Sequence, residues 1–117
     1  MLGTEHQKPK NVRITIGTIY RIIAQSQWGE DDHKALVYFK KALEICEEEL
    51  GPEHVVTAEN YDSIGAIYTG LDDCDKALEW YTKAVRLFEE TSGANDPLAI
   101  STRALLDSVK ERIGPDI

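Results

Sequence analysis

The sequence lacks a long apolar segment, a dense set of cysteines and a surplus of basic residues. No apolar run in the 117 residues approaches the roughly 20 needed to span a bilayer. The two cysteines, Cys46 and Cys74, form no C-x-x-C pair, which favours a reducing, cytoplasmic compartment over a disulfide-linked secreted fold. The net charge of −8 disfavours nucleic acid and membrane surfaces as partners, because both are anionic.

The sequence also lacks the local motifs of common enzymes. It contains no glycine-rich phosphate loop, no H-E-x-x-H and no G-x-S-x-G. Asp72, Asp73 and Asp75 lie close together, but their spacing does not fit an EF-hand loop, so we expect them to begin a helix. Cys46 and Cys74 are expected to be packing residues. We therefore predict no enzyme activity, no cofactor and no bound metal.

What the chain does contain is an internal repeat. Residues 34–51 match residues 76–93 at an offset of 42, and residues 2–20 match residues 50–68 at an offset of 48. The first match has eight identities, among them two lysines, two alanines and the final glycine. The offset therefore changes by six along the first unit, and we predict six additional residues at the bend between its two helices.

Apolar residues recur with the 3.6-residue period of an amphipathic helix in both units. The two stripes consist of Ala35, Phe39, Ala42 and Cys46 in the first unit and of Ala77, Tyr81, Ala84 and Phe88 in the second. No stretch alternates with the period of a strand, so we predict an all-α fold.

Capping residues mark the expected helix ends. The first helices of the two units are predicted over residues 10–27 and 55–70. The second helices are predicted to end near Gly51 and Gly93, because glycine readily adopts the left-handed conformation of a C-terminal cap. A fifth helix is predicted to begin at Asp96-Pro97, where aspartate suits the N-cap and proline the first turn.

The second unit contains Tyr61-x2-Ile64-Gly65-x2-Tyr68-x8-Ala77-x3-Tyr81-x2-Ala84. This motif resembles the tetratricopeptide repeat at every spacing. The 42-residue length of the unit, together with the segment Leu50-Gly51-Pro52-Glu53-His54, is similar to the kinesin-light-chain subclass. The first unit matches less completely, since fourteen residues instead of eight separate Tyr20 from Ala35 and Arg13 replaces the large residue of the motif.

The resemblance, which runs from about Leu2 to Leu106, implies a single domain over residues 1–117. Its expected form is a right-handed α-α superhelix of two helix pairs plus a C-terminal capping helix, five helices in total. The first repeat would occupy residues 9–50, the second residues 55–93, and the capping helix residues 96–113. A capping helix is expected because a solenoid must cover its last apolar face.

The same resemblance implies a protein or peptide partner, held on the concave face that the first helices form. Carried over position by position, that face comprises Asn11, Ile14, Thr18, Arg21, Glu59, Asp62, Ala66, Thr69, Ser101, Ala104 and Ser108. The alternative is that these residues are only a solvated helix face. The lysine, asparagine and arginine of the family's carboxylate clamp are replaced, among others, by Ile14, Thr18 and Ser63. The paired asparagines of kinesin light chains are likewise replaced, by Ile14-Thr15 and Asp62-Ser63.

Two further features have alternative interpretations. Trp28, in the predicted bend, is either an exposed anchor for a partner or a ring that folds back over its own helix pair. The acidic run Glu47-Glu48-Glu49 is interpreted as a solvated helix end.

The function itself has alternatives to partner binding in the groove. One is self-association into a homo-oligomer, because two and a half units are few for a solenoid. The other is a regulatory module of a larger protein. The segment Leu2–His6 matches the linker that follows a second helix, so we expect the chain to be part of a longer array.

Overall fold

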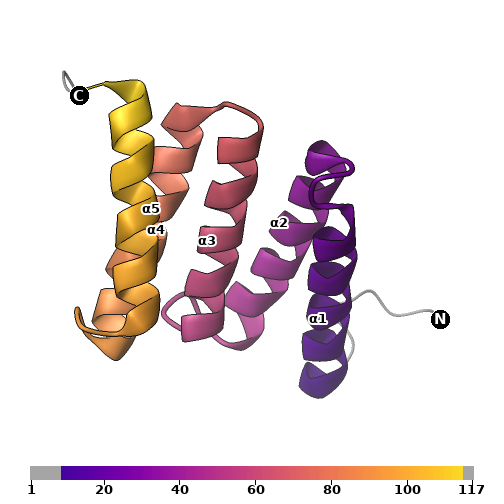
Figure 1. The fold of residues 1–117 in the computed structure, drawn as a ribbon. Coiled ribbons are helices and arrows are strands. Elements are labelled where there is room, and N and C mark those ends of the chain that lie inside the picture. The colour runs from indigo at the N-terminus through magenta and orange to yellow at the C-terminus, as the bar shows by residue number, and fades with distance from the viewer. Residues whose placement is uncertain (1–8, 115–117) are drawn as a thin grey trace.

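The computed structural model describes residues 9–114, which fold into five α-helices with no strand among them (Figure 1). The helices are α1 (Lys10–Gln27), α2 (Asp32–Glu49), α3 (Val55–Gly70), α4 (Cys74–Ser92) and α5 (Pro97–Ile113). The predicted all-α fold of five helices is thereby confirmed. The predicted linker Leu2–His6 lies outside the described residues.

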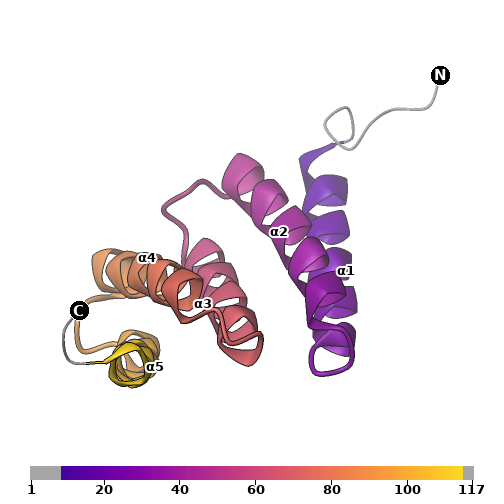
Figure 2. The ribbon, with the colours of Figure 1, turned by 90° about the horizontal axis from the view of Figure 1, so that it is seen from above.

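Successive helices are antiparallel neighbours, and they lie in two layers. Figure 1 looks onto α1, α3 and α5, with α2 and α4 behind them, and Figure 2 shows the same arrangement from above. Each helix packs on the next along the chain, but α2 packs on α3 less extensively than α4 packs on α5. None of these five helices has the combined length and apolar character that crossing a membrane requires.

A side chain just before each of the four helices α2 to α5 accepts a hydrogen bond from a free N–H group of the first turn, whereas Pro9 before α1 makes no such contact. Asp31 accepts from the Lys34 N–H, Asp73 from the Lys76 N–H and Asp96 from the Leu98 N–H. His54 has the same role at α3, where its Nδ1 accepts from the Val56 N–H. Because these contacts are local in sequence, they define where α2, α3, α4 and α5 begin.

The six additional residues of the first unit mainly lengthen α1. At the offset of 48 residues, the last residue of α3, Gly70, aligns with Ile22, whereas α1 continues for five more residues to Gln27. The connection after it has four residues, 28–31, against three residues, 71–73, in the second unit. Five of the six inserted residues thus lie in the last part of α1, which spans the predicted residues 10–27, and one lies in the connection between the two helices. Helical backbone satisfies its own hydrogen bonds, so extending the helix needs no new partners.

The core lies between the layers and is built from aromatic and aliphatic side chains. Phe39, Ile64 and Ile67 are fully buried there. Gly65 allows α3 and α4 to approach closely, since a Cβ added to it would lie 2.8 Å from the Tyr81 ring. Small residues at this crossing thus make room for the large ring, as the repeat motif implies.

Candidate partner-binding site

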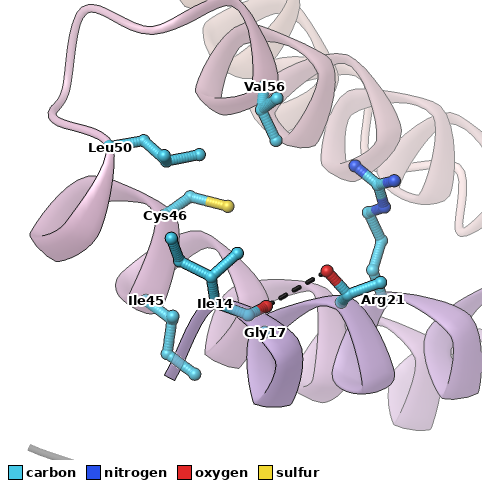
Figure 3. A pocket seen from close by; sticks show the side chains of 8 residues that line it. Ile14, Gly17, Arg21, Ile45, Cys46, Leu50 and Val56 are labelled. Atoms are coloured by element: carbon cyan, nitrogen blue, oxygen red, sulfur yellow. Dashed lines mark hydrogen bonds between the residues drawn. The ribbon is translucent and has the colours of Figure 1, made fainter. Parts of the chain in front are cut away.

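A cavity of about 160 Å³ lies between α1, α2 and α3 (Figure 3). It lies at the α2–α3 interface, which is the least extensive of the four interfaces between successive helices. Three of the residues predicted for the concave face, Ile14, Thr18 and Arg21, line it from α1. The rest of the lining comes from Gly17 on α1, from Val56 on α3, and from Ile45, Cys46 and Leu50. Its walls are therefore mainly aliphatic.

Arg21 is the one charged residue in the cavity lining. Within residues 9–114 it has no carboxylate partner, whereas Arg13, Arg103 and Arg112 each form an ion pair. The Thr18 hydroxyl donates to the Ile14 carbonyl oxygen at 3.1 Å and is therefore already satisfied. Figure 3 shows Arg21 and Leu50 at opposite sides of the cavity. An occupant would consequently meet an apolar wall on one side and a guanidinium on the other.

The Cys46 thiol is a poor nucleophile in this setting. Its sulfur points into the cavity in Figure 3 and accepts from the Asn60 amide at 3.3 Å. Burial raises the pKa of the thiol above its ordinary value, although the charge of Arg21 and the hydrogen bond from Asn60 act in the opposite direction. Because the thiolate is the reactive form, a raised pKa favours a packing role for Cys46.

The concave-face residues predicted on α3 are mostly committed to the fold. The Asp62 carboxylate accepts from the Thr102 hydroxyl of α5 at 3.3 Å, and the Thr69 hydroxyl donates to the Gly65 carbonyl oxygen at 3.0 Å. Ala66 packs against the main core. Glu59 is half-buried and acts electrostatically on Cys46 and on Asp62. The structure therefore does not bring these residues into the cavity that Ile14, Thr18 and Arg21 line.

Burial also raises the pKa of the Asp62 carboxyl, while the Thr102 hydrogen bond lowers it and Glu59 raises it further. The folded chain then binds this proton more tightly than the unfolded chain, so the ionised carboxyl destabilises the fold above its folded-state pKa. Asp62→Asn keeps an acceptor for Thr102 and is expected to stabilise the protein at neutral pH. Below the unfolded-state pKa of aspartate the gain should disappear.

Urea unfolding at a series of pH values would test this expectation. Asp107→Asn, on an exposed position of α5, is the matched control and should change little at any pH. A stability gain from Asp62→Asn that persisted in acid would contradict the assignment.

The remaining concave-face residues are exposed. Ser101, Ala104 and Ser108 lie on α5, away from the cavity, and Asn11 lies near the start of α1. The Asn11 side chain accepts from the Val12 N–H at 3.0 Å. The eleven predicted residues thus separate into three at the cavity, four on α3 and four exposed ones.

Trp28 folds back over its own helix pair. Its ring meets the buried Phe39 ring edge-on, with the ring centroids 5.9 Å apart, and 41% of the residue remains exposed. This contact is the one expected if the Trp28 ring packs on its own helix pair and does not serve as an anchor for a partner. The exposed part keeps the edge of the ring accessible to solvent.

A Trp28→Ala substitution is expected to lower the free energy of unfolding by about 1.5 kcal/mol, below the value for a fully buried tryptophan because the ring is partly exposed. Far-UV circular dichroism during urea unfolding is the suitable measurement, since Trp80 complicates fluorescence. Val37→Ala, at an exposed position of α2, should change stability little. A loss under about 0.5 kcal/mol for Trp28→Ala would instead favour the anchor interpretation.

Glu47 and Glu49 at the end of α2 make specific contacts with other helices, which corrects the prediction of a solvated helix end for Glu47-Glu48-Glu49. The Glu49 side chain is almost completely buried and forms an ion pair with Arg13 at 2.8 Å. Glu47 accepts from the Tyr61 hydroxyl at 3.2 Å. Arg13 and Tyr61 occupy equivalent positions of the two units at the offset of 48. Glu49 therefore joins α2 to this position on α1, and Glu47 joins α2 to the same position on α3.

The aspartates at the start of α4 have separate roles. Asp73 is the N-cap and Asp75 lies in the first helical turn, as expected for acids at a positive helix end. Asp72 has a left-handed φ of 63° and pairs with Arg112 of α5. No group of three or more metal-ligating side chains is gathered anywhere in residues 9–114.

Sequence reasoning missed the half of the cavity lining that comes from other helices. Cys46 belongs to the apolar stripe of α2, Ile45 directly precedes it, and Val56 lies in the first turn of α3. Cys46 was visible as part of an apolar periodicity, but that pattern does not say whether a side chain meets another helix or a cavity. Only the relative placement of three helices creates the cavity.

Antiparallel helix pairs that stack in sequence order, with a glycine at the crossing within a pair, define a helical-repeat protein. The profile of the tetratricopeptide repeat matches residues 15–90, more than half of the chain. The chain therefore belongs to the tetratricopeptide repeat family, whose members generally mediate protein–protein interactions. No curated protein matches the sequence significantly.

Proposed function

We propose that this protein is a non-enzymatic interaction module that holds a peptide or partner helix on the face formed by α1, α3 and α5. The observation that carries the proposal is the cavity, because three residues assigned to that face from sequence, Ile14, Thr18 and Arg21, line it together. A concave site with apolar walls and few polar groups is the usual form of a binding site.

Two finer assignments accompany this proposal. The 42-residue second unit favours the kinesin-light-chain-like subclass of the family. The two free cysteines favour a reducing compartment, and we place the protein in the cytoplasm.

Selection of random peptides on the full 117-residue chain would test the function. Selected peptides are expected to bind Arg21→Glu at least about tenfold more weakly, because the substitution reverses the charge at the cavity. Arg86→Glu is the matched control, since Arg86 is exposed on α4 and outside the cavity lining. Failure to select any peptide, or equal weakening by both variants, would contradict the proposal.

Self-association is the second candidate, and an exposed apolar stripe on α1 favours it. Val12, Ile19 and Ile22 are each at least 39% exposed. At the offset of 48 they align with Asn60, Ile67 and Gly70 of α3. Asn60 contacts Cys46 of α2, and Ile67 is fully buried. The stripe of α1 thus corresponds to the face that α3 packs against a preceding helix.

A second copy of the chain could cover this stripe, and sedimentation velocity over a range of concentrations would reveal it. Self-association predicts a concentration-dependent increase in mass that Ile19→Glu abolishes. A monomer at all concentrations would remove this candidate and leave the groove proposal intact.

A further inference from the structure

Lysines and aromatic rings alternate in a row across α2, α3 and α4. The ammonium groups of Lys40 and Lys76 lie 5.5 and 5.7 Å from the centre of the Tyr68 ring. The ammonium groups of Lys40 and Lys83 lie 6.0 and 4.6 Å from the centre of the Trp80 ring. The lysine–aromatic row, which a ring in contact with both Lys83 and Trp80 completes, consists of Lys40, Lys76, Lys83, Tyr61, Tyr68 and Trp80.

The lysine–aromatic row is separate from the groove proposed above. Its three lysines are exposed residues of α2 and α4, the helices that lie behind α1, α3 and α5 in Figure 1. Two of its rings, Tyr61 and Tyr68, reach it from α3. None of its residues lines the cavity between α1, α2 and α3.

The rings hold the ammonium groups apart from acids of the same helix. Glu79 and Lys83 stand four residues apart on α4, in the order that favours an ion pair along a helix. They form no such pair, and Lys83 lies over the Trp80 ring instead. Lys40 donates to the Tyr68 hydroxyl at 3.0 Å. Within residues 9–114, no lysine of the row pairs with a carboxylate, so each has ammonium donors for an incoming acceptor.

We propose that the lysine–aromatic row is a second docking surface, which binds an acidic segment of another protein. Three neighbouring ammonium groups have the charge opposite to that of successive aspartates or glutamates. A lysine that is already held over a ring loses less conformational freedom on binding than one that rotates freely. The row is therefore pre-organised for carboxylates. This surface goes beyond the proposed function and does not depend on it.

The burial of the rings favours carboxylates over nucleic acid as the ligand. Proteins that bind single strands present aromatic faces on which bases stack. Here Tyr68 is buried, and Trp80 is half-buried with two ammonium groups near its ring. These two rings therefore position lysines and leave little area for a base. The net charge of −8 also repels the phosphates of a nucleic acid.

Three acids near the row, Glu44, Glu47 and Glu79, reduce its positive charge. Glu47 accepts a hydrogen bond from the Tyr61 hydroxyl at 3.2 Å, whereas Glu79 is exposed and lies between Lys76 and Lys83 in the sequence of α4. An acidic ligand would be repelled by the Glu79 carboxylate. Glu79→Gln should therefore strengthen binding of such a ligand about twofold.

An acidic peptide without aliphatic side chains of its own would test the surface. Acetyl-tetraglutamate amide is the probe, and acetyl-tetraglutamine amide is its uncharged control. In ¹H–¹⁵N NMR titrations of the full chain at low ionic strength, the acidic probe alone is expected to shift the Trp80 indole signal. The Trp28 indole, whose ring contacts Phe39, is the internal reference. Salt at about 0.5 M should reverse the shift, because it screens exposed charges.

Paired substitutions then identify the lysines responsible. Lys76→Gln combined with Lys83→Gln is expected to weaken binding of the acidic probe at least about fivefold, whereas Lys76→Arg combined with Lys83→Arg should retain it. Lys34→Gln combined with Lys110→Gln is the matched control, because it removes two exposed charges outside the row. Circular dichroism would verify that each variant is folded.

Several outcomes would overturn the inference. They are an unmoved Trp80 signal, equal shifts from the acidic and neutral probes, and equal weakening by the two glutamine pairs. Tighter binding of a thymidine tetranucleotide would identify nucleic acid as the ligand instead. Self-association of the chain that the Lys76 and Lys83 glutamine pair abolishes would identify a second copy. Arg21→Glu should leave probe binding unchanged, so failure of the groove proposal is distinguishable from failure of this one.

Discussion

An Arg13→Met substitution is expected to lower the free energy of unfolding by about 3 kcal/mol, because it leaves the Glu49 carboxylate buried without its cation. The side chain of Glu49 is only 5% exposed, and its ion pair with Arg13 is 2.8 Å long. Removing one member of a buried pair is far more harmful than removing both. Arg13→Met combined with Glu49→Leu should therefore recover most of the loss.

Urea unfolding of the single and double variants would measure these changes. Arg112→Met is the matched control, because Arg112 pairs with Asp72 at the surface, where the two side chains are 43% and 83% exposed. An exposed pair of this kind contributes under about 1 kcal/mol. Similar losses from Arg13→Met and Arg112→Met would show that burial of Glu49 does not determine the effect.

Gly65→Ala is expected to destabilise the protein by about 2 kcal/mol, although alanine is a better helix former than glycine. The new Cβ would lie 2.8 Å from a carbon of the Tyr81 ring, and that ring is itself buried and cannot move aside freely. Overpacking should therefore outweigh the gain in helix propensity, which is about 1 kcal/mol.

Gly17→Ala is the matched control for this prediction. Gly17 occupies the same motif position in the first unit, where the nearest atom to an added Cβ is a methyl carbon of Ile45 at 3.0 Å. The Ile45 side chain lines the cavity and has space to yield, so Gly17→Ala should change stability by less than about 1 kcal/mol. A larger loss from Gly17→Ala than from Gly65→Ala would contradict this account of the two crossings.

The helices themselves were predictable from sequence because the interactions that define them are local. Asp96 followed by Pro97 begins α5 where expected, and α3 spans the predicted residues 55–70. Gly51 and Gly93 follow the second helices with φ values of 93° and 92°, in the positive-φ region that favours glycine. The spacing of the repeat motif also predicted the family, which the profile match over residues 15–90 shows.

Features that depend on contacts between distant residues were less accessible. An offset between two repeats gives the number of inserted residues and not the conformation they adopt, and five of the six lie in α1. Glu49 appeared to be a solvated acid until the fold brought Arg13 beside it. The cavity arises from incomplete packing between α2 and α3, for which no residue pattern exists.

The less extensive packing of α2 on α3 also has a consequence for cooperativity. In a repeat protein, stability is close to a sum of terms for each unit and for each interface between neighbours. The weakest interface here separates α1 and α2 from α3, α4 and α5, so the first two helices can open while the other three stay folded. A peptide held against both α1 and α3 would oppose that opening. Binding would then slow amide hydrogen exchange throughout α1 and α2, including residues that do not contact the ligand.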